Sequence, residues 1–242
     1  MSIVSINKIR KSVGEKRLLQ SASIELESGE ICALIGPNGA GKTTLIKSLM
    51  GLIAPDYGEV LIFNQTYSIS TRNILLKQIG LVLQFPREVL KMSVRDIYRE
   101  HFLYLGLSSN QSIEEMLQQV KLEVTENEKP ESFSLGMKQR LLLGIALSHQ
   151  PRLIILDEPF NGLDVDGVVL MKKILVEYAS KGNTVLITSH SLKELQDIAS
   201  TVVFMKKGKT QEKVNMKEID KSYNGELLQF YQESKNKEEI SE

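Results

Sequence analysis

The feature that most constrains the fold of this chain is a glycine-rich loop between a short apolar run and a helix-forming run. Residues Ile31–Ile35 are all apolar, Gly36–Thr43 follow directly, and Thr43–Met50 has helical spacing. The loop matches G-x-x-x-x-G-K-[ST] at every fixed position, in the strand–loop–helix context that this pattern requires. The residues expected to contact a bound nucleotide here are Gly36, Pro37, Asn38, Gly39, Ala40, Gly41, Lys42, Thr43 and Thr44.

The residue types in this loop suit the binding of phosphate groups. Glycines adopt backbone torsions that other residues avoid and keep side chains out of the loop, so successive N–H groups can converge on phosphate oxygens at a helix N-terminus. Lys42 is long enough to reach the β- and γ-phosphates, and the Thr43 hydroxyl suits Mg²⁺. The loop therefore predicts a site for a nucleoside triphosphate with Mg²⁺.

A second motif follows the apolar run Leu153–Leu156. The strand expected here ends in Asp157, whose buried charge needs a compensating cation, and a Mg²⁺ ion beside Thr43 would supply it. Glu158 comes next and can point toward a water in line with the γ-phosphate, as a general base. An acidic turn after a strand is common in isolation, but together with the phosphate loop it predicts a nucleoside triphosphatase.

The order of the apolar runs predicts an α/β fold with a mainly parallel sheet. Short continuous apolar runs suit strands that are covered on both faces, with helices between them. These runs are Ile31–Ile35, Leu81–Leu83, Leu153–Leu156, Val185–Ile187 and Val202–Met205. The helices expected between and after them are Thr43–Met50, Leu170–Tyr178 and Leu192–Ile198.

Two regions depart from this alternation. Near the N-terminus, apolar and polar residues alternate around Ile3–Ile6, Ala22–Leu26 and Glu59–Phe63, which predicts an antiparallel β subdomain. Residues from about 86 to 137 are polar and predict an inserted helical subdomain. Its two expected helices are Val94–Leu105 and Ile113–Val120.

We expect one nucleotide-binding domain over residues 1–225, followed by a charged tail at residues 226–242. In the tail, Leu227, Leu228, Phe230 and Tyr231 form one possible amphipathic turn. No internal repeat points to a second domain of the same kind.

Composition narrows the possible partners and compartment. Lys plus Arg and Asp plus Glu number 30 each, so no overall basic field favours nucleic acid, and no nucleic-acid partner is expected. The single cysteine, Cys32, excludes an internal disulfide and suits a reducing compartment. The first residues lack the apolar core of a secretory signal, and no apolar run approaches the roughly 20 residues that span a bilayer. We expect a cytoplasmic protein that another subunit brings to the membrane.

With these motifs in place, the chain resembles the ATP-binding cassette (ABC) ATPases over about Ile3–Lys209. The resemblance rests on further short motifs in a fixed order. They are Gln84 after Leu81–Leu83, the signature-like Phe133–Met137, the acidic Asp157–Pro159, Gly162–Asp164, and Ser189–His190. A phosphate loop alone leaves dozens of families open, whereas this ordered set favours one.

The resemblance implies that two cassettes, identical or paralogous, associate head to tail and hold each ATP between them. The phosphate loop of one copy would face the Ser134 loop of the other. Ser134 and Gly136 precede a helix expected near Met137, so a hydroxyl, a backbone N–H and a helix dipole would face an anion. Taken alone, Ser134 is equally well explained as an ordinary helix N-cap.

Other roles are implied by the same resemblance. Gln84 would contact Mg²⁺ or the γ-phosphate and relay its presence to the helical subdomain, and His190 would bind the γ-phosphate or orient the attacking water. Asp164 would contact the partner cassette, with a helix N-cap as the alternative. His101 and His149 match no motif and are expected to be structural or superficial.

The chain departs from the family pattern where the family stacks adenine on an aromatic ring. Val13 occupies that position, ahead of Gly14, and offers no π face, so base selectivity is expected to weaken. Leu18 is expected to pack against the base instead. In the signature, Leu135 and Met137 replace the usual glycine and glutamine.

Three functions come into question for a chain with these motifs. The first is the ATPase subunit of a membrane transporter, an exporter by its resemblance to subunits of peptide-antibiotic and lantibiotic efflux, with a separate transmembrane permease as partner on the inner face of the membrane. The second is a soluble ABC protein acting on ribosomes or DNA, which usually has a second cassette or a long coiled coil. The third, an inactive regulatory binder, conflicts with the intact Lys42, Asp157, Glu158 and His190.

Overall fold

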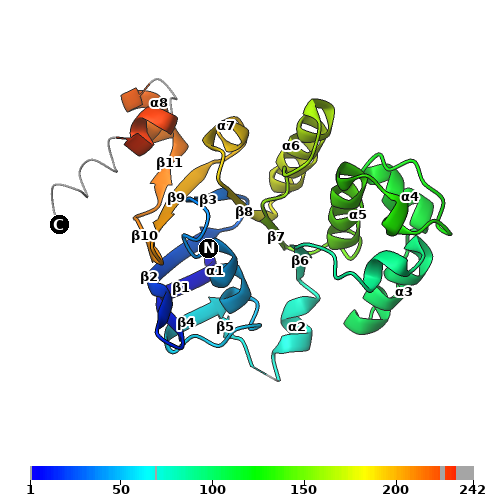
Figure 1. Cartoon of the computed structure of the whole chain (residues 1–242), viewed down its shortest axis with the longest axis horizontal. Helices are drawn as coiled ribbons and strands as arrows, with labels where there is room; N and C mark the ends of the chain where they lie inside the picture. The colour runs from blue at the N-terminus through cyan, green and yellow to red at the C-terminus, as the bar shows by residue number, and fades with distance from the viewer. Residues whose placement is uncertain (1, 69, 224–226, 233–242) are drawn as a thin grey trace.

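A computed structural model describes residues 2–68, 70–223 and 227–232 and shows a mixed β-sheet flanked by helices (Figure 1). Within these residues the strand order is β5-β4-β1-β2-β10-β9-β3-β8-β7-β6, and β11 also pairs with β9. The α/β class and the mainly parallel core are confirmed.

The N-terminal part of the sheet is antiparallel, as expected. Its strands are β1 (Ser2–Val13), β2 (Lys16–Glu27), β4 (Tyr57–Ile62) and β5 (Gln65–Thr66). Strand β1 pairs with both β2 and β4. Strands β1 and β2 are longer than their alternating cores suggested, because pairing continues outward to Val13 and Lys16, where the chain reverses at Gly14 with φ 58°.

The remaining strands form the parallel core. They are β3 (Ile31–Ile35), β6 (Ile79–Val82), β7 (Leu153–Asp157), β8 (Thr184–Ser189) and β9 (Thr201–Lys206). Strand β3 lies between β8 and β9, and β7 lies between β8 and β6, all in parallel. Two short strands complete the sheet, β10 (Lys209–Thr210), which joins β9 to β2, and β11 (Val214–Asn215).

Side chains of the parallel strands alternate between two hydrophobic cores. In β3, Ile31, Ala33 and Ile35 face the core beneath the helices, while Cys32 and Leu34 face the core shared with the antiparallel strands. All five are at most 4% exposed, which explains why the run is apolar throughout instead of alternating.

The helices gather in two places (Figure 1). Helix α1 (Lys42–Leu49) covers the sheet near the N-terminal strands, whereas α3 (Val94–Leu105), α4 (Ile113–Gln119) and α5 (Leu135–Leu147) form a cluster at the opposite end. Short helical elements lie between these helices: α2 (Arg72–Leu76), η1 (Val89–Lys91) and η2 (Pro130–Ser132). After the cluster come α6 (Val165–Ser180), α7 (Leu192–Leu195) and α8 (Met216–Tyr223).

Several helix boundaries differ from the predicted ones for local reasons. Helix α5 begins at Leu135, not near Met137, because the Ser134 hydroxyl caps it by accepting from the Met137 N–H at 3.2 Å. Helix α6 begins five residues before the expected Leu170, because Asp164 caps it in the same way. Helix α7 ends at Leu195, earlier than expected, and α8 was not predicted.

Of the expected tail, only residues 227–232 are described; residues 224–226 and 233–242 lie outside the described residues. Leu227 is fully buried, and the rings of Phe230 and Tyr231 pack on Phe204 of β9, while Leu228 is 56% exposed. This arrangement agrees with the predicted amphipathic turn. Among the described residues, no helix combines the length and apolarity that crossing a bilayer would require.

Candidate functional site: a phosphate loop facing two carboxylates

The glycine-rich loop connects the buried end of β3 to the start of α1. A Cβ atom on Gly36 would lie 2.2 Å from the Met205 carbonyl oxygen of the neighbouring strand, so a side chain is excluded there. Gly39 and Gly41 have φ values of 79° and 112°, which glycine adopts readily. The Ala40 carbonyl accepts from the Gly208 N–H at 2.8 Å, which ties the loop to the turn after β9.

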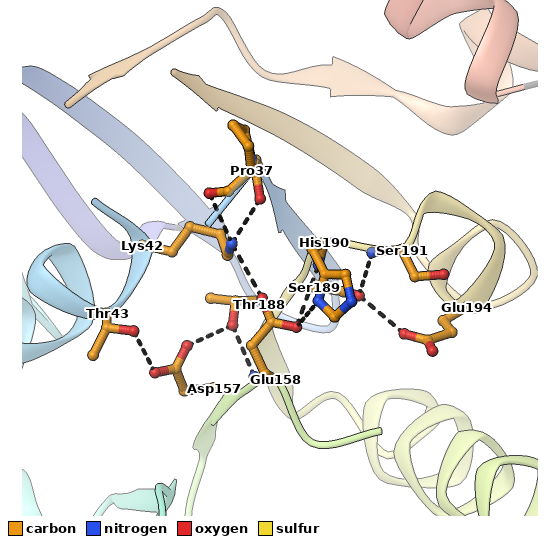
Figure 2. Close-up of polar contacts among 11 residues, drawn as sticks. Pro37, Lys42, Thr43, Asp157, Glu158, Thr188, Ser189, His190, Ser191 and Glu194 are labelled. Carbon is orange, nitrogen blue, oxygen red and sulfur yellow. Dashed lines mark hydrogen bonds and ion pairs between the residues drawn. The ribbon is translucent and has the colours of Figure 1, made fainter. Parts of the chain in front are cut away.

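Lys42, the first residue of α1, is held by the loop it follows. Its side chain is only 6% exposed, and Nζ donates to the Gly36 carbonyl at 2.6 Å and, more weakly, to the Pro37 carbonyl at 3.4 Å. Nζ also lies 3.1 Å from Glu158 Oε1 (Figure 2). A buried ammonium group requires such partners, because removing it from water is otherwise costly.

Asp157 and Thr43 meet where β7 ends beside α1. The Thr43 hydroxyl donates to Asp157 Oδ2 at 2.7 Å, although the residues are 114 positions apart (Figure 2). The other Asp157 oxygen accepts from the Thr188 hydroxyl at 2.7 Å. A hydroxyl and a carboxylate are the hard oxygen donors that Mg²⁺ takes, so this pair fits the predicted metal site.

Thr188 was not singled out in the sequence, yet it joins both acidic residues. It is fully buried at the carboxyl end of β8, and its hydroxyl accepts from the Glu158 N–H at 2.9 Å while it donates to Asp157. Its position directly after the apolar run Val185–Ile187 was the available signal. The carboxyl ends of adjacent parallel strands meet at one edge of the sheet, where ligands bind in open α/β folds.

Glu158 lies between Lys42 and His190. Its Oε2 is 2.7 Å from His190 Nδ1, and the His190 N–H also donates to it at 3.3 Å. Because a carboxylate only accepts hydrogen bonds, the ring contact requires a proton on Nδ1. The backbone of Glu158 has φ 52°, an uncommon value for a non-glycine residue and one found at functional sites.

The loop around His190 is braced by side chains that the sequence analysis did not select. The Ser189 hydroxyl donates to Glu194 Oε2 at 3.0 Å and accepts from the Ser191 N–H at 2.8 Å. Glu194 lies on α7, so this short helix positions the segment that carries His190 (Figure 2).

A cavity of about 490 Å³ opens beside the phosphate loop. Its lining comes from loop residues 38–44 and Glu158, and from residues of β2 and of the turn after β9. Leu18 lines the cavity as expected. Val13 is 61% exposed at the end of the β1–β2 hairpin, where it pairs with the lining residue Lys16, and its contact with the base stays a prediction.

The Ser134 loop and Gln84 lie outside this cavity. Ser134 is exposed, and a Cβ on Gly136 would lie 3.5 Å from Leu163 in the segment that leads to Asp164. Asp164 caps α6 by accepting from the Gly167 N–H at 2.8 Å, which was the alternative explanation for this residue. Gln84 is exposed and follows β6, the strand next to the one that carries Asp157.

His101 and His149 lie away from the site and contact each other. His101 Nε2 is 3.0 Å from His149 Nδ1, and His149 Nε2 is 3.1 Å from the Ile79 carbonyl at the start of β6. Burial lowers the pKa of His101 to about 4 and lowers the pKa of His149 as well. Their role is structural, since they connect α3 to the end of α5 and to the sheet.

The likeness to known proteins covers the phosphate loop and the acidic strand end of this site. A family model described as ABC transporter matches residues 19–161. The chain belongs to the ABC transporter family. The matched ABC segment contains the phosphate loop, Ser134 and both acidic residues.

Curated relatives and solved structures agree with this membership. The lantibiotic transport ATP-binding protein SrtF of Streptococcus pyogenes is 35% identical over 93% of this chain and 95% of its own. The bacitracin transport ATP-binding protein BcrA of Bacillus licheniformis is 33% identical over 98% of this chain and 77% of its own. A solved ATP-binding subunit of an ABC transporter superposes with a TM-score of 0.84 at 25% identity, covering 96% of this chain and 98% of that one.

The cassette is therefore an ATP-binding and ATP-hydrolysing subunit of an ABC transporter. A dimeric post-hydrolysis structure of the ATP-binding cassette MJ0796, bound to ADP and phosphate, shares the fold with a TM-score of 0.79 at 22% identity, over 88% of this chain and 98% of that one. The relatives and structures give no support to the ribosome- or DNA-directed alternative.

Proposed function

We propose that this cassette powers the export of peptide antibiotics through a separate membrane permease, with Mg²⁺ and ATP held between two cassettes. One observation supports the proposal that ATP is held between two cassettes. The phosphate loop that contains Lys42 and the exposed Ser134 loop belong to the same chain. Neither Ser134, which caps α5, nor Gly136 lines the nucleotide cavity. A second copy is the natural source of the Ser134 loop that covers the phosphates.

The donor set supports Mg²⁺ in this site. Thr43 and Asp157 already touch through two of the oxygens that would hold the ion, and Gln84 follows the adjacent strand at the same edge of the sheet. Mg²⁺ bound there would neutralise charge on the phosphate oxygens. Thr188 keeps one Asp157 oxygen in place by donating to it, so the carboxylate presents the other to Thr43.

The contacts of Glu158 support its role as general base. His190 holds Oε2, and Oε1 faces Lys42 without a hydrogen-bond partner. When the γ-phosphate engages Lys42, Glu158 would lose this ion pair and become free to take a proton from the attacking water. His190 would then orient the carboxylate through its Nδ1–H.

The helical cluster supplies a surface for the permease. Leu103 and Tyr104 of α3 are 70% and 64% exposed, and Ile74 of α2 is 54% exposed. Arg72 Nη2 donates to the Tyr104 hydroxyl at 2.6 Å, which connects α2 to α3 on this face. We propose that this face, with residues 84–92 nearby in sequence, contacts the permease on the inner side of the membrane.

The names of the relatives support the cargo. SrtF and BcrA are named for lantibiotic and bacitracin transport, and both resemble this chain over more than nine-tenths of its length. Peptide antibiotics are the cargo class that these names share.

Cysteine cross-linking tests the two-cassette arrangement. The only native cysteine, Cys32, is fully buried and its pKa is raised to about 12, so surface cysteines can be modified selectively. A chain carrying Asn38→Cys and Leu135→Cys should form a cross-linked dimer with a short bis-maleimide when ATP is present. The matched pair Asn38→Cys with Lys181→Cys should not. Equal cross-linking by both pairs, or no effect of ATP, would contradict the arrangement.

A membrane pull-down tests the transport role. The Glu158→Gln form, trapped with ATP, should recover a multi-span membrane protein from solubilised membranes, and a Leu103→Asp, Tyr104→Asp variant should not. Cells that lack the cassette should become more sensitive to peptide antibiotics. Recovery of ribosomal subunits in place of a membrane protein would overturn the proposal.

A further inference from the structure

The loop that carries His190 is held by a carboxylate that lies outside the nucleotide cavity. This carboxylate belongs to Glu194 on α7, which is not one of the residues that line the cavity. Ser189, the last residue of β8 and only 1% exposed, donates its hydroxyl proton to Glu194 Oε2 at 3.0 Å and accepts from the Ser191 N–H at 2.8 Å (Figure 2). A hydroxyl group has one proton, so Glu194 fixes its direction and leaves the Ser189 oxygen free to accept from Ser191.

These hydrogen bonds determine how His190 is presented to Glu158. Ser189 and Ser191 flank His190, and the bond from the Ser191 N–H to the Ser189 hydroxyl closes a local turn around it. Within this turn the His190 N–H and the ring Nδ1 both meet Glu158 Oε2, at 3.3 and 2.7 Å. The His190 side chain is 47% exposed, so packing restrains it little and its orientation depends on these hydrogen bonds.

Helix α7 gives Glu194 a fixed position. Its next residue, Leu195, is fully buried in the core beneath the helices. Four residues are too few for a helix to be stable by itself, so contacts with the rest of the chain hold α7 in place. The ion pair between Asp197 and Lys172 of α6 adds little, because Asp197 is 72% exposed. The partly buried Ser189–Glu194 bond is therefore the polar contact that ties the anchored helix to the end of β8.

We propose that Glu194 is a positioning residue for ATP hydrolysis. Through Ser189 it fixes the loop of His190, and His190 in turn holds Glu158 Oε2 so that this carboxylate faces the attacking water. Glu194 acts only through these residues, since it lies outside the nucleotide cavity. The inference rests on the proposed roles of Glu158 and His190, and it adds the group that sets their geometry.

Steady-state kinetics of Glu194→Ala and Glu194→Gln test the proposal. Loss of the acceptor in Glu194→Ala should lower kcat by about three- to tenfold, the effect of one hydrogen bond. The KM for ATP should stay unchanged, because the phosphate contacts remain. Glutamine retains a side-chain oxygen that can accept from Ser189, so Glu194→Gln should recover most of the lost turnover. An unchanged kcat in Glu194→Ala, or an equal loss in both variants, would overturn the inference.

Asp197→Ala is the matched control. It removes an acidic side chain two residues beyond the same helix, together with the ion pair to Lys172, and leaves the contact between Ser189 and Glu194 in place. We expect Asp197→Ala to keep the wild-type kcat. A loss of kcat as large as in Glu194→Ala would show that turnover depends on the general anchoring of α7, and the role assigned to Glu194 would be wrong.

Nuclear magnetic resonance of the imidazole rings gives a readout that does not depend on turnover. The chain has three histidines, and His101 and His149 contact each other away from the site. In the nucleotide-free chain, Glu194→Ala should shift the ring signals of His190 and leave those of His101 and His149 in place. Asp197→Ala should shift none of them. Unshifted His190 signals in Glu194→Ala would contradict the proposed path through Ser189.

A double variant separates failure of this inference from failure of the proposed function. If Glu194 acts through Glu158, Glu194→Ala should cause no further loss of turnover in the Glu158→Gln chain, because residues that act as one unit are not additive. A further loss as large as in the single variant would make Glu194 independent of Glu158 and overturn this inference alone. Wild-type turnover in Glu158→Gln itself would instead overturn the proposed general base.

Discussion

The ammonium group of Lys42 lies 3.1 Å from the carboxylate of Glu158, across the position where the phosphate loop faces the end of β7. The Lys42 side chain is 6% exposed and that of Glu158 is 20% exposed, so the pair is largely shielded from water. The residue expected to bind the γ-phosphate and the residue expected to activate water thus neutralise each other. If the triphosphate binds Lys42 as proposed, it would replace Glu158 there, which would couple nucleotide binding to the release of Glu158.

Glu158→Gln should separate binding from hydrolysis. Removal of the carboxylate leaves Lys42 without its competing anion, so ATP should bind up to about fivefold more tightly, equivalent to about 1 kcal/mol for a partly exposed pair. Hydrolysis should fall by about a hundredfold or more, since a general base contributes at least that much. Turnover by phosphate release and affinity by calorimetry measure the two effects.

Glu59→Gln provides the control, because Glu59 is an exposed glutamate on β4. It should leave both quantities unchanged. Unaltered turnover in Glu158→Gln would remove Glu158 from the role of base.

Thr188→Val should reduce turnover without a comparable change in KM. The variant leaves the Glu158 N–H and one Asp157 oxygen without the hydroxyl that now joins them, at a cost of about 1–3 kcal/mol in stability. Thr188→Ser retains the hydroxyl and should restore turnover.

Thr184→Val is the matched comparison, since Thr184 is equally buried on β8 but bonds to Glu27 and Gly29 far from the site. It should lower the thermal unfolding temperature with little effect on kcat. If the two valine variants lose kcat equally, the role assigned to Thr188 is no more than structural.

Ser134→Asp should distinguish the helix cap from the phosphate contact. Aspartate caps a helix as well as serine does, so thermal stability should be preserved, whereas Ser134→Ala should cost about 1 kcal/mol. A carboxylate facing the phosphates of a second copy would repel them, so ATP-dependent cross-linking should be abolished in Ser134→Asp and only weakened in Ser134→Ala. Dimerisation of Ser134→Asp at the wild-type ATP concentration would show that this loop does not meet a phosphate.

The His101–His149 pair should make the fold sensitive to acid. The pKa of His101 is lowered from 6.5 to about 4 by burial, so between these values the unfolded chain binds more protons than the folded one. The contribution of His101 to the free energy of unfolding is therefore fully present above pH 6.5, and it declines as the pH falls toward 4. The decline should reach up to about 2 kcal/mol between pH 7 and pH 5.

Urea unfolding of the wild type and of His101→Phe at both pH values measures this contribution. Carboxylates titrate in both proteins. The difference between the pH dependences of the two proteins therefore isolates the contribution of His101. A His101→Phe variant as sensitive to acid as the wild type would refute the assignment.

Local patterns in the sequence predicted much of the fold. The α3 bounds Val94–Leu105 were predicted correctly, because the helical spacing of apolar residues acts over a few residues. The helix starts after Ser134 and Asp164 were misplaced, although both residues were identified as possible caps. A side chain that can cap a helix leaves open whether the helix begins there or later, and only the hydrogen bond to the third residue decides it.

The sequence predicted some residues of the site and missed others. Lys42, Asp157 and Glu158 belong to contiguous motifs, and the structure brings them together with Thr43. Thr188 belongs to no such motif, and its role arises because β8 lies beside β7 in the sheet. Val13 lies at the end of the β1–β2 hairpin, paired with Lys16, and its expected place near the base stays a prediction.

The sequence alone determined the phosphate loop, the acidic strand end, the alternation of buried strands with helices, and hence the ABC family. Those features depend on torsions, helix ends and periodicities that span fewer than about ten residues. The tertiary structure alone decided that Lys42 pairs with Glu158 and that Thr188 joins both carboxylates. Such contacts follow from the order of strands in the sheet, which brings distant residues within a few ångströms and which no local pattern encodes.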